Sequence, residues 1–278
     1  MGVRRQLAIA ALLTVGFTTA GTAAQGASAS TRTGASTQVS ASVHTSVGAA
    51  ASVRSAASVR AAAFHAPHKT LKPGMRGAAV KELQTRLRAL GYVPGKIDGR
   101  YGGSTQAAVW AFQKVQGIRP TSTVAAKTWN ALENPKAPKV LVPGGAATRV
   151  EINLTRQIMV YYVSGSVKLI SHISSGSGIP YVEYAVWNGK RQRFSGGAVT
   201  PTGDFKTSWR VSGWHRSYLG QLYNPIFFNG GIALHGALSV PLYPASHGCV
   251  RLPMAVAGIL PGMLGTGVPV HVRGHFKR

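Results

Sequence analysis

Residues 246–252 read SHGCVRL, and a His-Gly pair stands upstream at residues 235–236. Cys249 is the single cysteine of the 278 residues, so no intramolecular disulfide, four-cysteine zinc site or redox pair can form. A free cysteine attacks as thiolate, which is only a few per cent of the thiol at pH 7. It therefore needs a nearby base or a positive field. His235, His247 and Arg251 are the candidates, and together these residue types predict a catalytic cysteine with a histidine base.

Strand-like runs surround this segment on both sides. Apolar stretches separated by glycine and proline are typical of short strands, whereas one run near residues 254–264 favours a helix. The expected strands span residues 149–154, 157–163, 167–173, 205–211, 231–234 and 268–272. Residues 181–198 look like an insertion, either a lid over a cleft or a plain surface loop. The pattern predicts a mainly β domain over residues 146–273.

The part of the chain before this domain has the spacing of helices. Apolar residues recur at helical intervals in three segments, and the first two end at Gly91 and Gly117, as helices often do. A turn-rich loop at residues 95–102 separates these two segments. The segments start near Val80, Ser104 and Val124. We therefore expect a small all-α three-helix domain over residues 69–135.

Several short motifs occur through this helical segment: Leu83-Gln84, Leu90-Gly91-Tyr92, Asp98-Gly99, Tyr101-Gly102, Thr105, Ala108-Val109, Phe112-Gln113 and Thr128-Trp129. On these residues the segment resembles the peptidoglycan-binding domain found beside many wall enzymes. The resemblance implies a module that binds peptidoglycan, although most of these residues are core and turn positions and do not identify ligand contacts. Residues 120–122 read PTS where the family usually has an Asp-Gly turn. A helical spacer without a ligand is the alternative.

The β domain resembles the L,D-transpeptidase (YkuD-type) catalytic domain. Two further elements support the Ser-His-Gly-Cys-x-Arg motif: residues 200–205 read TPTGDF, and residues 227–236 read FFNGGIALHG. The resemblance implies a two-domain chain in which a helical peptidoglycan-binding module precedes a mainly β catalytic domain. It also implies a reaction on a peptidoglycan stem tetrapeptide that releases D-alanine and forms 3→3 cross-links with an amine acceptor. Such an enzyme would act in peptidoglycan biosynthesis, cell wall organization and cell shape.

The resemblance also implies a role for each motif residue. Cys249 would be the nucleophile, His235 the general base, and the backbone amides of Gly248 and Cys249 the oxyanion donors. Arg251 and His247 would order the nucleophile loop or bind the substrate carboxylate, and Ser246 would support that loop by hydrogen bonding.

One departure from the family lies beside the base. Gly236 follows His235 where some members place a triad serine, so we expect a backbone carbonyl to orient the imidazole. We assign Gly236 to the substrate-binding residues and expect no metal and no cofactor. A fair prediction from the resemblance is thioacylation of Cys249 by carbapenems.

Other readings of the same residues remain open. A zinc site of His235, His247 and Cys249 would lack a nearby carboxylate base, and a sortase spaces its His, Cys and Arg differently. Paired-carboxylate glycoside hydrolysis is poorly supported by a total of 6 acidic residues. Within the enzyme class, the alternative is an L,D-carboxypeptidase, in which water replaces the amine. Outside it, the alternatives are a non-catalytic peptidoglycan-binding scaffold and an inert buried cysteine.

The N-terminal residues predict export. Arg4 and Arg5 precede a short apolar stretch and the small residues Ala27-Ser28-Ala29, which is the pattern of a signal peptide over residues 1–29. A retained membrane anchor is the alternative. Residues 30–68, rich in Ala, Ser and Thr, predict a disordered linker. A net charge of +25 predicts an anionic partner, and outside the cell this favours anionic wall polymers over nucleic acid; a charge that only confers solubility is the alternative. We expect a secreted protein of the bacterial cell wall.

Overall fold

The computed structural model describes residues 64–276, which all lie in one compact unit of the chain. The predicted signal peptide and most of the predicted linker lie outside these residues. Within the described residues, no helix has the length and apolar character needed to cross a membrane.

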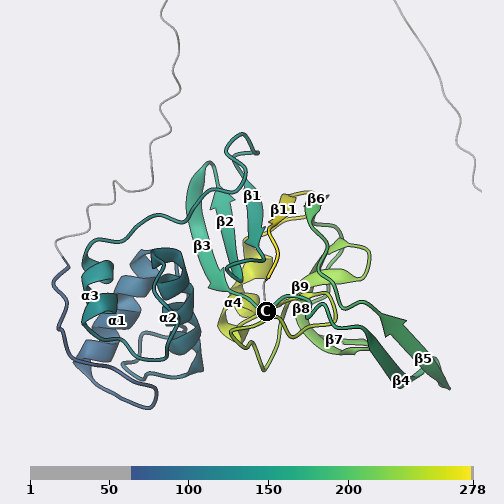
Figure 1. Cartoon of the computed structure of the whole chain (residues 1–278), viewed down its shortest axis with the longest axis horizontal. Coiled ribbons are helices and arrows are strands. Elements are labelled where there is room, and N and C mark those ends of the chain that lie inside the picture. The colour runs from purple at the N-terminus through teal and green to yellow at the C-terminus, as the bar shows by residue number, and fades with distance from the viewer. Residues whose placement is uncertain (1–63, 277–278) are drawn as a thin grey trace, which may run out of the picture. The chain divides into compact units, whose positions relative to one another are not determined.

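The first three elements along the described chain are helices, as predicted: α1 (Ala78–Ala89), α2 (Gly103–Gln116) and α3 (Ala126–Glu133) (Figure 1). Helix α2 ends at Gly117, whose φ of 71° is the left-handed conformation that glycine adopts without strain. Two buried glutamines hold the loops between the helices. The Gln84 side chain bonds Asp98, Gly99, Arg100 and Thr105, and the Gln113 side chain bonds Thr121, Thr123 and Thr128. Residues on which the family resemblance of this module rests, such as Gln84 and Gln113, therefore stabilise its core and turns.

The packed chain begins before the predicted boundary at residue 69. Phe64 packs against the core of the helices, and Ala66 is buried with its N–H donating to Glu133 Oε1 at 2.9 Å. Residues 64–68, predicted as the end of a disordered linker, thus belong to the folded part. Phe64 and Ala66 follow a stretch rich in Ala and Ser and show no helical periodicity, so the sequence did not indicate that the folded module starts before residue 69.

The C-terminal part is mainly β, as predicted, with one short helix. One sheet has five strands in the order β3-β2-β1-β11-β6, a second has four in the order β10-β9-β8-β7, and β4 and β5 form a hairpin of their own (Figure 1). The bounds are β1 Arg149–Asn153, β2 Ile158–Val163, β3 Ser166–His172, β4 Tyr181–Trp187, β5 Lys190–Gly196, β6 Gly203–Lys206, β7 Trp214–Ser217, β8 Gly220–Asn229, β9 Ile232–Gly236, β10 Val250–Leu252 and β11 Pro269–Arg273. Helix α4 (Met254–Ile259) and a 3-10 turn (Leu260–Gly262) fill the predicted helical run.

A single apolar core lies between the two larger sheets and α4. Val150, Ile152, Leu234, Val250 and Val270 are all fully buried in it. Burial of these side chains fixes which face of β9 and β10 turns inward, and the next residues along each strand turn outward.

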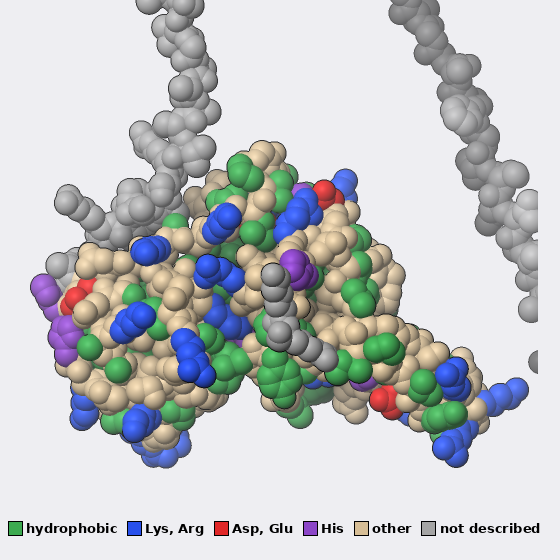
Figure 2. Space-filling view, in the orientation of Figure 1, with side chains coloured by type: hydrophobic (Ala, Val, Ile, Leu, Met, Phe, Trp, Pro, Cys, Tyr) green, Lys and Arg blue, Asp and Glu red, His purple; other side chains and the backbone are tan. Residues whose placement is uncertain are grey.

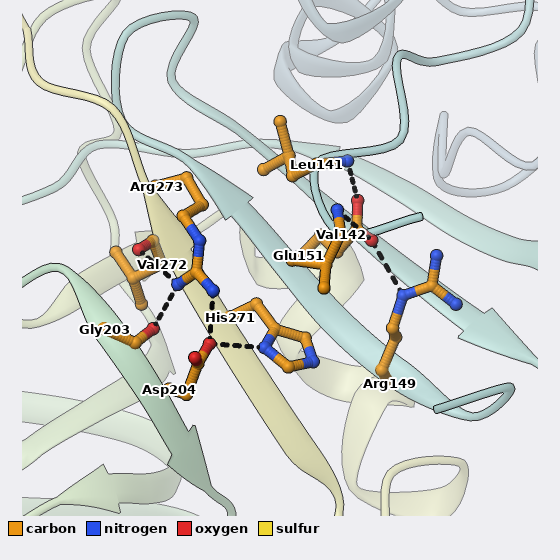
Figure 3. Close-up of polar contacts among 9 residues, drawn as sticks. All are labelled: Leu141, Val142, Arg149, Glu151, Gly203, Asp204, His271, Val272 and Arg273. Carbon is orange, nitrogen blue, oxygen red and sulfur yellow. Dashed lines mark hydrogen bonds and ion pairs between the residues drawn. The ribbon is translucent and has the colours of Figure 1, made fainter. Parts of the chain in front are cut away.

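Polar contacts fix the segment that links the helices to the sheet (Figure 3). The buried Glu151 carboxylate accepts hydrogen bonds from Leu141 N–H at 2.7 Å, Val142 N–H at 3.3 Å and Arg149 Nε at 2.7 Å.

A second acidic residue joins two strands of the first sheet. On β6, the exposed Asp204 bonds His271 Nδ1 at 2.6 Å and Arg273 at 2.5 Å, both on β11. Most of the few acidic residues of this domain thus serve the fold.

The helices and the first sheet share a second apolar core. Leu83, Leu87 and Phe112 of the helices are buried together with Ile158 and Ile170 of β2 and β3. Gly91, just after α1, accepts a hydrogen bond from Ile170 N–H at 2.8 Å. The two parts of the chain are therefore joined by burial as well as by the linking segment.

Candidate active site

The parallel pair β9–β10 places the predicted base and nucleophile together. In this pair Leu234 lies opposite Val250 and His235 lies opposite Arg251. Leu234 and Val250 face the core, so His235 and Arg251 face the other side, as does Cys249, one residue before β10. His235, Cys249 and Arg251 all line one cleft of about 950 Å³.

Most of the predicted site residues meet at this cleft. Ser246, His247 and Gly248 line it together with the three residues above, whereas Gly236 does not. A Cβ atom on the buried Gly236 would lie 2.8 Å from the Ala257 Cβ and 3.1 Å from both Tyr223 Cβ and Met254 Sδ. Gly236 thus supports the packing of α4 and does not contact the cleft, and this packing also leaves no room for the serine that some family members have there.

Residues 246–249 form a tight turn closed by Ser246. The Ser246 hydroxyl donates to the Cys249 carbonyl at 2.5 Å and accepts from the Gly248 N–H at 3.0 Å. Gly248 has φ 138°, a conformation that favours glycine, and a Cβ there would lie 3.1 Å from the Val199 carbonyl oxygen. The Gly248 amide predicted as an oxyanion donor is therefore engaged by Ser246, which leaves the Cys249 amide as the other candidate.

Thr200 holds this turn from outside, a role that the predicted site residues did not include. Its buried Oγ1 donates to the Gly248 carbonyl at 2.6 Å and accepts from the Gly176 N–H at 2.8 Å. Thr200 opens the TPTGDF element, so the sequence did point to it as part of a motif. Sequence alone did not show that this motif contacts the SHGCVRL segment.

The His235 imidazole is held as a neutral base. Its Nδ1 lies 2.9 Å from the Gly236 carbonyl oxygen, an acceptor, so Nδ1 carries the proton and Nε2 keeps its lone pair. This is the backbone carbonyl partner that we expected. Burial is the main cause that lowers the pKa of His235 to about 4; the Gly236 hydrogen bond opposes this shift and the Arg251 charge adds to it. The imidazole is therefore uncharged at neutral pH and able to accept a proton.

Cys249 is a neutral thiol in the same cleft. Its Sγ lies 3.6 Å from the Gly231 carbonyl oxygen, to which the thiol can donate. Burial raises the pKa of the Cys249 thiol above its ordinary value, whereas the Ala233 backbone and the Arg251 charge act in the opposite direction. On both residues the uncharged form is therefore favoured, so a preformed pair of thiolate and imidazolium is disfavoured.

The predicted insertion at residues 181–198 contains the β4–β5 hairpin, and both ends of β4 contribute to one wall of the cleft. The ring of Tyr181 meets the imidazole of His247 edge to face, with centroids 4.7 Å apart, and Glu183 Oε1 lies 3.7 Å from His247 Nε2. Tyr181 and Trp187 line the cleft. His247, predicted to order the nucleophile loop or bind substrate, thus connects that loop to the hairpin.

Partly exposed aromatic side chains also line the cleft. Trp209 stacks on Phe227 with ring centroids 3.6 Å apart, and Trp214 and Tyr218 line the same cleft.

Figure 2 shows Lys and Arg side chains spread over the visible face and gathered at the free end of the hairpin. Lys190, Arg191 and Arg193 of β5 are the exposed basic residues there. Among residues 64–276, no group of three or more His, Cys, Asp or Glu side chains could hold a metal ion.

The described residues thus form a three-helix module joined to a mainly β domain, with a cysteine and a histidine at one cleft. Family models match both parts. Residues 76–132 match the PG_binding_1 peptidoglycan binding domain, and residues 147–272 match the YkuD L,D-transpeptidase catalytic domain.

A solved structure has the same architecture. The crystal structure of the L,D-transpeptidase (residues 123–326) from Xylanimonas cellulosilytica is 37% identical, with a TM-score of 0.65, over 74% of this chain and 98% of that chain. The chain belongs to the L,D-transpeptidase family.

Curated relatives match over shorter segments. A probable N-acetylmuramoyl-L-alanine amidase of Bacillus licheniformis is 44% identical over 69 residues, which are 24% of this chain and 20% of that protein. An uncharacterized protein of Kitasatospora aureofaciens is 41% identical over 58 residues, which are 20% of this chain and 49% of that protein. The chain therefore spans half or less of the length of these relatives.

Proposed function

We propose that this chain is a secreted L,D-transpeptidase of the bacterial cell wall. Cys249 is acylated by the peptidoglycan stem tetrapeptide, D-alanine leaves, and an amine acceptor takes the acyl group to form a 3→3 cross-link. The observation that carries the proposal is the arrangement on β9–β10. Cys249 and His235 share one cleft, and His235 donates through Nδ1 to a backbone carbonyl and so keeps Nε2 available as a base.

The proposed reaction has two halves. Cys249 Sγ attacks the carbonyl carbon of the amide between stem residues three and four, while His235 Nε2 takes the thiol proton. The Cys249 amide donates to the oxyanion, and the Gly248 amide could join it only by leaving Ser246. The C–N bond then breaks, and D-alanine leaves with the proton from His235. The acceptor amine attacks the thioester, gives its proton to His235, and the thiol is restored.

The remaining cleft residues bind and orient the substrate in this proposal. Arg251 supplies the positive charge that faces the cleft beside Cys249, where a substrate carboxylate would be attracted. His247 and Tyr181 hold the hairpin wall against the nucleophile turn. The helical module binds peptidoglycan, and the exposed basic residues favour anionic wall polymers as further partners.

Intact mass spectrometry tests this function. The chain is incubated with a disaccharide tetrapeptide or with a carbapenem, beside the Cys249→Ala variant. A covalent adduct on the native chain that is missing from the variant supports acylation of Cys249. Cross-linked products then support transfer, whereas a released tripeptide without cross-links indicates an L,D-carboxypeptidase. A folded native chain that forms no adduct with either compound would instead be a peptidoglycan-binding scaffold.

A further inference from the structure

A lysine of the helical module is buried against the catalytic domain. Lys114, near the end of α2, is only 8% exposed, and its Nζ lies 3.1 Å from the Gln157 carbonyl oxygen and 2.8 Å from His172 Nδ1. No acidic side chain bonds it; the charged neighbour is Arg156, whose guanidinium donates to the Lys114 carbonyl at 2.8 Å. A buried lysine without a carboxylate is costly, so this position calls for an explanation.

His172, the last residue of β3, connects this lysine to the cleft. Its other ring nitrogen, Nε2, lies 3.0 Å from the Val240 carbonyl oxygen. Burial and the Lys114 charge lower the pKa of His172 to about 3, so the ring is neutral and has one donor and one acceptor nitrogen. Since a carbonyl can only accept, Nε2 donates to Val240, and Nδ1 accepts from Lys114. Lys114 therefore stabilises the tautomer that can hold Val240.

A second route leads from Lys114 to the nucleophile turn. The residue whose carbonyl Lys114 bonds, Gln157, is fully buried, and its side chain accepts from Ser175 N–H at 2.8 Å and donates to Ser175 Oγ at 2.8 Å. The Ser175 carbonyl in turn accepts from the N–H groups of Ala245 and Ser246, each at 3.0 Å. Ser246 closes the turn that carries Cys249.

Both routes end on one segment of the chain. Residues 237–246 connect His235 to the nucleophile turn, and Ala237, Leu238, Ser239 and Ser246 of this segment line the cleft. Ser174 adds a further contact, since its hydroxyl donates to the Tyr243 carbonyl at 2.8 Å. The segment is also held by the Ala237 N–H, which donates to the Leu252 carbonyl, and by the bonds of Ser246 within the nucleophile turn. Lys114 bonds His172 and Gln157, the residues from which the two routes start.

We propose that Lys114 is a positioning residue of the catalytic cleft: through His172 and Gln157 it fixes segment 237–246, so the helical module is a working part of the enzyme and not only its wall anchor. The proposal rests on the proposed function for its effect on turnover. Its structural half, the link between Lys114, the His172 tautomer and Val240, does not depend on any substrate.

Kinetics of the full-length chain test the effect on the cleft. The Lys114→Met variant keeps the length of the side chain and removes its donor, and Lys127→Met removes an exposed lysine of the same module as the matched control. We expect acylation by the disaccharide tetrapeptide to fall about threefold to tenfold in Lys114→Met, as for one lost hydrogen bond, with no change in Lys127→Met. Alkylation of Cys249 by iodoacetamide, which needs no cleft wall, should stay within twofold of the native rate.

A double-mutant cycle separates positioning from general loss of packing. The His172→Gln variant keeps a side-chain amide donor but breaks the link to Lys114, so adding Lys114→Met to it should cost much less than in the native background. Equal losses in both backgrounds, an unchanged acylation rate in Lys114→Met, or an alkylation rate that falls as much as acylation would each overturn the proposal.

Nitrogen-15 NMR of the imidazole rings tests the structural half, and its first measurement, on the native chain, needs no substitution. The native chain should show His172 with a protonated Nε2 and a bare Nδ1, and Lys114→Met should lose this single tautomer. A native His172 with its proton on Nδ1 would overturn the proposal. If the native chain is not acylated but has the expected tautomer, the proposed function fails while the link between Lys114 and the segment stands.

Discussion

Thr200→Val isolates one hydrogen-bonding group that joins two distant motifs. Valine has nearly the shape of threonine but neither donates nor accepts. In the native chain Thr200 Oγ1 donates to the Gly248 carbonyl at 2.6 Å and accepts from the Gly176 N–H at 2.8 Å. The substitution therefore leaves two backbone groups without their partner, one of them on the buried Gly248.

The expected loss follows from these two groups. An unsatisfied buried donor or acceptor costs about 1–3 kcal/mol, and the Gly176 N–H, in a partly exposed residue, stays at the low end. We therefore expect the free energy of unfolding to fall by about 2–4 kcal/mol. In a folded part of this size, that change lowers Tm by about 4–16 °C. Acylation of Cys249 should fall by about tenfold or more, because the turn that aims the thiol is no longer held.

Thermal unfolding and the acylation rate measure the two effects, with Thr200→Ser as the matched control. Serine keeps the hydroxyl and loses one methyl group, which costs about 1 kcal/mol. Its Tm should therefore fall by less than half as much, and its acylation rate should stay near the native value. With an error in Tm of about 2 °C assumed, the reasoning is refuted if the Tm of Thr200→Val lies within that error of the native value. It is also refuted if the Tm of Thr200→Ser falls as much as that of Thr200→Val.

Three further predictions concern packing and pH. Gly236→Ser should lower the free energy of unfolding by about 1–3 kcal/mol without adding a working triad serine, because its Cβ would meet Ala257 at 2.8 Å; urea unfolding that matches the native chain would contradict this. The free energy of unfolding should fall as pH drops from about 6.5 to about 4. In the folded chain the pKa of His235 is lowered to about 4 and that of His172 to about 3, so over this range the unfolded chain binds protons that the folded chain does not. A Tm that is constant over this range would exclude the buried neutral imidazoles. The isolated segment 141–278 should be less stable than the whole chain by about 5 kcal/mol or more, because Ile158, Val160 and Ile170 lose their cover; an equal Tm for both would show that the shared core contributes little.

Local sequence patterns predicted the elements well where periodicity was strong. The three helices and the strands β1, β2 and β3 lie within a few residues of the expected ranges. The hairpin β4–β5 was left open between a lid and a loop because its residues are mostly exposed on both faces, so no apolar alternation marks the strands. Phe64 and Ala66 escaped prediction because nothing local shows that they pack on the helices.

The site could be predicted only as far as its motif residues extend along the chain. That Cys249 and His235 act together could be predicted because both belong to motifs visible in the sequence. The carbonyl partner of His235 could be predicted because a glycine, which has no side chain to orient the ring, follows it. Gly236 was wrongly expected at the cleft, since only the packed α4 shows that the position is filled. Lys114 and His172 had no motif at all. Their link depends on a contact between residues 58 positions apart, which no local pattern encodes.

The same few polar groups serve both the fold and the site. Ser246, Thr200 and Gln157 are buried, and each bonds backbone groups of a segment that would otherwise have no partner at that depth. Because residues 237–249 form no helix and no named strand, their shape depends on these outside partners. Lys114 of the helical module bonds Gln157 and His172, and the His172 ring in turn contacts the Val240 carbonyl of this segment. If Lys114 positions the cleft as we propose, a change in that module alters the cleft through hydrogen bonds.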